Sequence, residues 1–269
     1  WGIPVPFSPA HVTYVWFDAL INYISAVGSF DAAGNYKSKW WPADVHLIGK
    51  DILRQHAVIW PIMLKALGIE PPRCVFAHGW WLVGEDKMSK SRGNVVSPVE
   101  MVAKFGIDVY RYFLLRDVPF GADGNFSEEA IIKRFNSDLA NDLGNLVYRT
   151  LNMVEKYFSA TVPDVDIWKV KLTDEAEAIK EKIRLIPEEV AESLAARMDY
   201  SSALDRIWEL INMANKYVEN TKPWNLAKEE RLDELKSFIR ILVEVIRAVA
   251  LLVFPFMPAT AASITEQIG

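Results

Sequence analysis

Short runs of β-branched and aromatic residues alternate with helical patterns in the first part of the chain. Residues 11–17 predict a strand, and residues 18–27 predict a helix after it. Residues 44–48 predict a second strand, and the turn Gly49-Lys50-Asp51 leads from it into a helix with apolar residues at helical spacing. Strand, glycine turn and helix in this order make half of a doubly wound α/β unit, whose substrates bind at the carboxyl ends of the strands. We expect Trp16 and Asp51 to lie there.

The next segment predicts a third strand at residues 75–80 and a hairpin in which residues 81–83 turn near Gly84. Ser97-Pro98-Val99-Glu100 is a capping box with proline at the first helical position. It predicts a helix that begins there and ends near Gly106. Residues 87–94 are therefore held between ordered elements at both ends.

From Ser127 onward the pattern is helical almost throughout, which predicts a bundle of helices. The expected helices begin at Ser127 and cover residues 138–158, 173–198, 201–220 and 230–254, with a short helix after Pro258. Pro187 is expected to kink or divide the third of them. The first part of the chain mixes strand and helix patterns, and the part from Ser127 is helical, so the expected fold class is α/β followed by all-α.

Composition is that of a globular protein, because 51% of the 269 residues are hydrophobic and 24% are charged. The longest apolar run, residues 239–257, is interrupted by Arg240, Glu244 and Arg247, so we expect no membrane contact. The net charge of -5 argues against indiscriminate nucleic-acid binding through a basic surface. It leaves room for a selective contact with one folded RNA.

Cys74 is the only cysteine, which excludes an internal disulfide and a Cys-rich zinc site in this segment. Its surroundings, Cys74-Val75-Phe76-Ala77, predict a buried strand residue, and this cysteine usage fits a reducing, cytoplasmic setting. The sequence starts at Trp1 and begins like the middle of a domain, with no targeting segment. We expect an N-terminal part to precede it, lost by truncation, by cleavage or in a natural split.

The segment Lys87-Met88-Ser89-Lys90-Ser91, followed by Arg92-Gly93-Asn94, carries the clearest chemical signal. The long stems of Lys87 and Lys90 allow both ammonium groups to reach a polyphosphate, whose charge grows in a transition state. The alternative is a solvated turn in which the lysines are coincidental. The pattern GxxxxGK[ST] is absent from the sequence, so a P-loop is not expected.

Four stretches occur in the order known from one enzyme family: YVWFDALINY at residues 14–23, HLIGKDILRQHAVIWP at 46–61, HGWWLVGEDKMSKSRGN at 78–94 and DLANDLGNLVYR at 138–149. The chain resembles the C-terminal half of methionyl-tRNA synthetases, class I aminoacyl-tRNA synthetases whose second motif is KMSKS. Their first motif, HIGH, the first half of their nucleotide fold and their zinc-bearing insertion would all precede Trp1.

This resemblance implies three domains. Residues 1–75 would be the second half of a Rossmann-like nucleotide-binding domain, residues 76–126 a small connective domain with the KMSKS loop, and residues 127–269 a helical-bundle anticodon-binding domain. The implied cofactor is ATP with Mg²⁺, and a structural zinc, if any, would lie in the missing N-terminal part.

The resemblance also implies a methionine site, made of Trp16, Ala19, Tyr23, Asp51 and His56. Aromatic edges and one weak hydrogen-bond donor suit a polarizable thioether, and the Tyr23 hydroxyl and the His56 ring are the candidate donors. Without the family, aromatic residues after a strand are more often part of a core, and a lone histidine on an apolar helix is usually structural.

The implied ATP-binding residues are Gly49, Asp51, His78, Gly79, Lys87, Met88, Ser89, Lys90 and Ser91. Lys87 and Lys90 would be catalytic, with Lys90 on the leaving pyrophosphate. Gly49 would let a ligand approach the backbone, and Asp51 would accept from a ribose hydroxyl or the substrate ammonium. Asp51 could equally be a helix N-cap. Gln55 stands where many family members carry an aromatic residue, which puts the packing of the pocket wall in doubt.

Asn145 and Arg149 are four residues apart and so share one helix face. An amide and a guanidinium can read unstacked base edges, and the ring of Trp224 could stack on an exposed base. The resemblance assigns these three residues to the anticodon of tRNA(Met). Otherwise Asn145 and Arg149 would form a solvated face, and Trp224 would anchor the end of the bundle.

The implied activity is methionine activation by ATP, followed by transfer to tRNA(Met). We expect the partners to be tRNA(Met), L-methionine, ATP and the missing N-terminal half of the catalytic domain, without which this segment would be inactive. Three alternatives remain: another class I synthetase, such as one for leucine, isoleucine or valine; a non-catalytic tRNA-binding module; and one subunit of a split enzyme.

Overall fold

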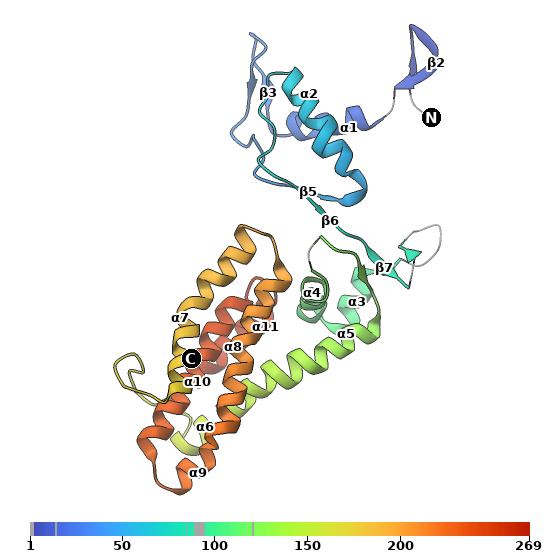
Figure 1. Cartoon of the computed structure of the whole chain (residues 1–269). Helices are drawn as coiled ribbons and strands as arrows, with labels where there is room; N and C mark the ends of the chain where they lie inside the picture. Colours follow the sequence, from blue (N-terminus) through green and yellow to red (C-terminus); the bar gives the residue numbers. More distant parts are fainter. Residues whose placement is uncertain (1–2, 14, 85, 89–94, 120) are drawn as a thin grey trace. The chain divides into compact units, whose positions relative to one another are not determined.

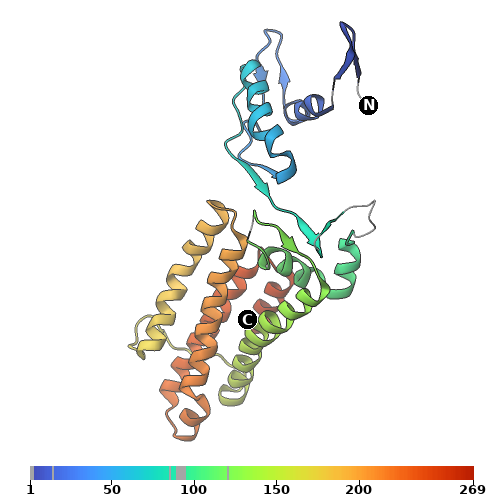
Figure 2. The same ribbon diagram turned by 45° about the vertical axis from the view of Figure 1, so that its right-hand side comes forward.

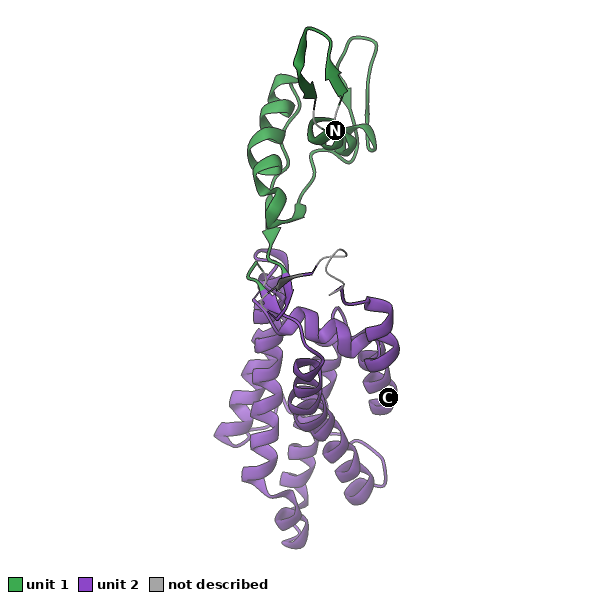
Figure 3. Ribbon diagram, turned by 90° about the vertical axis from the view of Figure 1, so that its right-hand side faces the viewer, with its two compact units in different colours: residues 1–80, 121–123 green, residues 81–120, 124–269 purple. Residues whose placement is uncertain are grey.

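The computed structural model describes residues 3–13, 15–84, 86–88, 95–119 and 121–269, with only the backbone of Asp86 and Lys87. The chain forms two compact units (Figure 3). One comprises residues 1–80 and 121–123, and the other comprises residues 81–120 and 124–269. The finer division predicted from the sequence, with boundaries after residues 75 and 126, stays a prediction.

The first unit combines short strands with two α-helices (Figure 1). Its strands are β1 (Ile3–Val5), β2 (Ser8–Thr13), β3 (Ser29–Phe30), β4 (Tyr36–Lys37), β5 (His46–Gly49) and β6 (Val75–His78). Its helices are α1 (Val15–Ser25), the 3-10 helix Lys50–Ile52, the π-helix Gln55–Ile59 and α2 (Trp60–Ala66). The pairs β1/β2 and β3/β4 are antiparallel, whereas β5 and β6 are parallel. The parallel pair is the α/β element that the sequence predicted.

The core of this unit lies between α1 and α2. Buried side chains of both helices meet there, namely Leu20, Ile24, Trp60, Met63 and Leu64, together with Ile69. Leu20 and Ile24 are four residues apart, and Met63 and Leu64 follow Trp60 by three and four residues, so the buried side chains of each helix line one face. This packing holds α1 and the helix that follows β5 in one rigid group.

The predicted strand at residues 11–17 is wrong in its second half. β2 ends at Thr13, and α1 already begins at Val15, so Trp16 lies in the first helical turn and not at the end of a strand. β-branched and aromatic residues favour strands only weakly, and helix packing overrides that preference. Asp18, in the first turn of α1, favours this helix start through the helix dipole.

Cys74 is exposed, which corrects the prediction of a buried residue. Its carbonyl accepts from His46 N, so its backbone does join the pairing of β5 with β6. Side chains alternate along a strand, and Cys74 lies on the same face as Phe76, which pairs with Leu47. Leu47 is 53% exposed, so this face of the strand pair is the open one.

The second unit begins with a three-stranded sheet in the order β8-β7-β9. These strands are β7 (Trp81–Val83), β8 (Asp86–Lys87) and β9 (Gly124–Asn125), and the predicted hairpin of β7 and β8 is present. The helices that follow are α3 (Pro98–Phe105), α4 (Ile107–Arg116), α5 (Glu128–Arg134), the π-helix Phe135–Gly144 and α6 (Asn145–Phe158).

Both predicted helix starts in this region are confirmed. The Ser97 hydroxyl accepts from Glu100 N at 3.4 Å, and the Ser127 hydroxyl accepts from Ala130 N at 3.1 Å. Each serine satisfies a backbone donor that the first helical turn leaves without a partner. The helix after Ser97 ends at Gly106, whose φ of 83° is accessible to glycine without strain.

Long helices form the rest of this unit. They are α7 (Asp174–Ala195), α8 (Tyr200–Thr221) and α10 (Leu232–Val253), accompanied by the shorter α9 (Pro223–Lys228) and α11 (Pro258–Ile268). The long helices lie side by side around one apolar core (Figures 1 and 2), as the predicted bundle requires. α7 continues through Pro187, which therefore does not divide it.

The charges within the apolar run of α10 form a cluster around one buried carboxylate. Glu244 is 5% exposed, and its carboxylate accepts from Arg240 at 2.6 Å and from Arg247 at 2.8 Å. Pairing makes the burial of this carboxylate tolerable. Among the described residues, none of the helices combines the length and the apolar character that crossing a bilayer requires.

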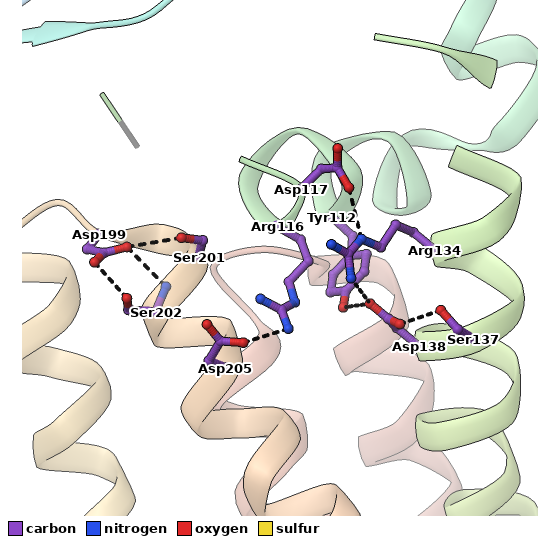
Figure 4. A network of polar contacts seen from close by, with 10 residues as sticks. All are labelled: Tyr112, Arg116, Asp117, Arg134, Ser137, Asp138, Asp199, Ser201, Ser202 and Asp205. Atoms are coloured by element: carbon purple, nitrogen blue, oxygen red, sulfur yellow. Dashed lines mark hydrogen bonds and ion pairs between the residues drawn. The ribbon is translucent and has the colours of Figure 1, made fainter. Parts of the chain in front are cut away.

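A buried polar network ties α4 to the π-helix and α5 (Figure 4). The Tyr112 hydroxyl donates to Asp138 Oδ2 at 2.7 Å, and Arg134 contacts both Asp138 and Asp117. Tyr112 is fully buried, and burial together with the Asp138 carboxylate raises its pKa far above the usual value. The tyrosine therefore acts here as a hydrogen-bond donor, and the network fixes the start of the bundle against α4.

Candidate functional site

Parallel strands β5 and β6 end side by side, with Gly49 opposite His78 in the register. The residues after these ends are Lys50 and Asp51 on one segment and Gly79 and Trp80 on the other. This is the edge at which α/β folds bind their ligands. Here the structure brings together Gly49, Asp51, His78 and Gly79, all of which the sequence predicted.

Two glycines make close packing at this edge possible. A side chain at residue 79 would place its Cβ 2.0 Å from the carbonyl oxygen of Ala122, so only glycine lets the two backbones approach. A Cβ at residue 49 would lie 2.6 Å from Asp51 Oδ1, which shows that the Asp51 carboxylate folds back over Gly49. Gly49, with no side-chain cap bond, is the N-cap of the 3-10 helix that contains Asp51, so the interpretation of Asp51 as an N-cap is wrong.

Lys50, Trp80 and Asp123 form a charged group beside Asp51. Lys50 Nζ contacts both carboxylate oxygens of Asp123, at 2.6 and 2.5 Å, and lies 4.2 Å from the centre of the Trp80 ring. Trp80 N donates to Asp123 Oδ1 at 2.8 Å, and the indole Nε1 donates to Asp51 Oδ1 at 3.4 Å. Lys50, and then the Trp80 amide, hold the pKa of Asp123 below its usual value, so Asp123 stays ionised.

Sequence reasoning missed this group. Asp123 lies 73 residues from Lys50, in the segment Gly121-Ala122-Asp123-Gly124, which has no local feature of a site. Lys50 and Trp80 adjoin predicted residues, so their place next to Gly49 and Gly79 was the only available signal.

Trp16, Ala19 and Tyr23 lie on one face of α1, since they are three and four residues apart. Trp16 is 47% exposed and Ala19 is exposed, whereas Tyr23 is half-buried. The Tyr23 hydroxyl is 2.9 Å from Nε2 of His56, which is 4% exposed. The structure thus brings Tyr23 and His56 together, although they come from different helices.

The hydrogen bonds of His56 define its proton positions. Nδ1 lies 2.9 Å from the carbonyl oxygen of Ile52, and a carbonyl only accepts, so Nδ1 carries a proton. In the neutral ring Nε2 then accepts from the Tyr23 hydroxyl. Donation from Tyr23 to a ligand requires this hydroxyl hydrogen to turn away from His56, or a second proton on the His56 ring.

His46 is a further member of this aromatic group that sequence reasoning missed. Its ring centre lies 4.4 Å from that of Tyr23 and 6.0 Å from that of His56, and its Nε2 accepts from Trp60 Nε1 at 3.3 Å. Burial, followed by the charge of His56, lowers the pKa of His46, so the ring is kept neutral. Gln55 is buried beside the group, and its Oε1 has no partner among the described residues.

The lysine segment lies mostly outside the described residues, which include neither Ser89, Lys90 nor Ser91. The backbone of Lys87 lies in β8 opposite Leu82. Met88 packs against the core cluster that contains Met101 and Phe113, so its side chain anchors the start of the segment in the second unit.

The residues predicted to contact an anticodon lie in the helical unit. Asn145 begins α6 and is exposed, and Arg149, one turn later, is half-buried. Trp224 lies in α9 and is 51% exposed, while its neighbours Pro223 and Leu226 are buried. α9 is therefore anchored by apolar residues and presents part of the Trp224 ring to solvent.

Comparison with known proteins gives a consistent result. The family model of "tRNA synthetases class I (M)" matches residues 1–151, and the model "Anticodon-binding domain of tRNA ligase" matches residues 176–269. Methionine--tRNA ligases of Caldanaerobacter subterraneus subsp. tengcongensis and Clostridium tetani are each 50% identical to this chain over its whole length. The chain spans 42% and 41% of these two relatives.

Solved structures agree with the sequence comparison. Mycobacterium tuberculosis methionyl-tRNA synthetase in complex with methionyl-adenylate superposes with a TM-score of 0.85 at 43% identity, over 99% of this chain and 52% of that one. The apo form of the M. tuberculosis enzyme gives a TM-score of 0.81 at 41% identity, with coverage of 99% and 51%. On this evidence the chain belongs to the methionyl-tRNA synthetase family of class I tRNA synthetases.

Proposed function

We propose that this chain contributes to methionine–tRNA ligation, in which ATP activates methionine to methionyl-adenylate and the methionyl group passes to tRNA(Met). Membership of the family supports this assignment, as does the likeness to an enzyme solved with methionyl-adenylate. The observation that supports the proposal most strongly is the hydrogen bond between Tyr23 and the buried His56. Tyr23 lies on the same face of α1 as Trp16 and Ala19. That arrangement offers aromatic surface and a polar group to one ligand.

The proposed methionine site consists of Trp16, Ala19, Tyr23, Asp51 and His56. The exposed ring of Trp16 provides apolar surface for the thioether side chain, and the small Ala19 leaves space beside it. The Asp51 carboxylate pairs with the substrate ammonium. In this arrangement the ammonium group of methionine lies at the carboxyl end of β5, and its side chain lies against α1.

The proposed ATP site consists of Gly49, Asp51, His78 and Gly79 at the strand ends and of the segment Lys87 to Ser91. Lys90, assisted by Lys87, would stabilise the charge of the departing pyrophosphate. Mg²⁺ would accompany the nucleotide phosphates. Within the described ranges, no group of three or more His, Cys, Asp or Glu side chains is arranged to hold a metal ion.

For tRNA(Met), the proposed contacts are Asn145, Arg149 and Trp224. The exposed amide of Asn145 and the partly open ring of Trp224 can receive unstacked anticodon bases. We propose the division into a Rossmann-like half, a connective domain and an anticodon-binding domain, because the proposed methionine contacts and the proposed tRNA contacts then each fall within one domain.

The whole activity would also need the N-terminal half of the catalytic domain. Large apolar side chains in the first unit are exposed, among them Phe17 at 56%, Leu47 at 53% and Ile62 at 63%. Apolar surface of this kind is typical of a face that another segment covers. We expect the described segment alone to lack activity.

Amino-acid-dependent exchange of pyrophosphate into ATP, measured with the full-length protein that contains this chain, tests the proposal. Methionine should drive exchange, and leucine, isoleucine and valine should not. Exchange driven by one of those three instead would identify another class I synthetase. Binding of tRNA in a gel shift without any exchange would identify a non-catalytic module.

A further inference from the structure

We propose that Lys50, Trp80 and Asp123 together position the carboxylate of Asp51 for binding the substrate. The inference rests on the proposed function, because it gives these three residues a task in the methionyl-adenylate site. They are positioning residues, which act through Asp51 and not by touching the substrate. Three separate segments meet to form the arrangement, at the carboxyl ends of β5 and β6.

The first step is the attachment of Trp80. Its backbone N donates to Asp123 Oδ1 at 2.8 Å, and the preceding residue, Gly79, packs against the backbone of Ala122. The segment with Asp123 therefore holds the backbone of Gly79 and Trp80 in place. Because a Cβ on residue 79 would be 2.0 Å from a backbone oxygen, this contact cannot adjust by moving a flexible side chain.

The second step is the orientation of the indole ring. Lys50 Nζ is 4.2 Å from the ring centre and bonds both oxygens of Asp123. A cation over the ring face favours one plane of the indole, and the ion pair fixes the cation. The side chains of Lys50 and Asp123 are 37% and 35% exposed, so solvent screens the pair, and its main effect is geometric.

The third step is the orientation of the Asp51 carboxylate by the indole ring. The indole Nε1 donates to Asp51 Oδ1 at 3.4 Å, and the same oxygen lies 2.6 Å from the position that a Cβ on residue 49 would have. The carboxylate is thereby directed before a ligand arrives. A pre-oriented group loses less conformational freedom on binding, which strengthens affinity without any additional contact to the ligand.

The substitution Trp80→Phe tests this in the full-length protein. Phenylalanine keeps a ring beneath Lys50 and removes the indole N–H. We expect KM for methionine in pyrophosphate exchange to rise about 3- to 10-fold with kcat nearly unchanged, because the Asp51 carboxylate loses the hydrogen bond that orients it before the substrate binds. Trp40→Phe is the matched control, since Trp40 is 67% exposed with Lys39 Nζ 4.9 Å from its ring, and it should leave KM unchanged.

A double-mutant cycle separates positioning from direct contact. In an Asp51→Ala background, Trp80→Phe should change kcat/KM for methionine less than about twofold, because the acceptor of its indole hydrogen bond is gone. Lys50→Met should behave in the same way and gives a second measurement if Trp80→Phe folds poorly. An equal effect in both backgrounds would overturn the inference, and so would a Trp80→Phe enzyme with unchanged KM. In either case wild-type exchange driven by methionine would leave the proposed function standing, whereas its absence would refute both.

Discussion

Replacing Tyr23 by phenylalanine gives the sharpest test of the aromatic site. The substitution removes one oxygen atom, which lies 2.9 Å from Nε2 of His56. His56 is 4% exposed, so water cannot readily replace the lost partner. Leaving such a group without a partner costs about 1 to 3 kcal/mol of the free energy of unfolding. The expected result is a lower urea midpoint for the full-length protein.

Tyr36→Phe is the matched control for this loss of stability. The Tyr36 hydroxyl donates to the carbonyl oxygen of Ile24 at 2.8 Å, in the same unit and also partly buried. Its removal should cost about 1 kcal/mol of unfolding free energy. Both variants therefore destabilise the unit, but only Tyr23 belongs to the proposed methionine site.

Discrimination between methionine and norleucine, measured as the ratio of their kcat/KM values in pyrophosphate exchange, separates the two roles of the hydroxyl. Norleucine has a methylene group where methionine has sulfur, so it cannot accept a hydrogen bond there. Tyr23→Phe should lower the ratio about fivefold, which corresponds to about 1 kcal/mol for one weak bond, whereas Tyr36→Phe should preserve it. An unchanged ratio in Tyr23→Phe would refute the assignment of this hydroxyl to the thioether.

Other changes test other parts of the molecule. Lys90→Ala should lower adenylate formation about 100-fold or more with little effect on methionine binding, and near wild-type exchange would exclude its role on pyrophosphate. Trp224→Ala should weaken aminoacylation of tRNA but spare adenylate formation, whereas equal losses in both assays would reduce this residue to a structural one. Tyr112→Phe should cost about 1 to 3 kcal/mol of unfolding free energy in urea titration, because the Asp138 carboxylate loses a buried donor, and an unaltered midpoint would contradict that.

Features governed by local chemistry were predictable from the sequence. Ser97 and Ser127 begin helices because a serine side chain caps the backbone N–H three residues later. The donor and the acceptor of each cap thus belong to one short stretch of sequence. The turn Gly49-Lys50-Asp51 after β5 likewise carries its information in consecutive residues. Such features need no knowledge of the rest of the fold.

Features that depend on distant contacts were not predictable. Residues 11–17 read as one strand, yet packing of α1 against α2 makes the second half helical. The π-helix Phe135–Gly144 has an apolar pattern that fits an α-helix equally well. In the structure, a Cβ on residue 144 would lie 2.9 Å from the carbonyl oxygen of Leu139, a close approach that the sequence does not reveal. The ion pair of Lys50 with Asp123 joins two segments that are 73 residues apart, and no local pattern in the sequence indicates that they meet.

A crystal structure of the full-length protein with a non-hydrolysable methionyl-adenylate analogue would test the central claim most directly. The account predicts the thioether against Trp16 and next to the Tyr23–His56 pair, and the ammonium group within hydrogen-bond distance of Asp51. An analogue bound elsewhere, with these side chains arranged as they are here and without contact to it, would contradict the account.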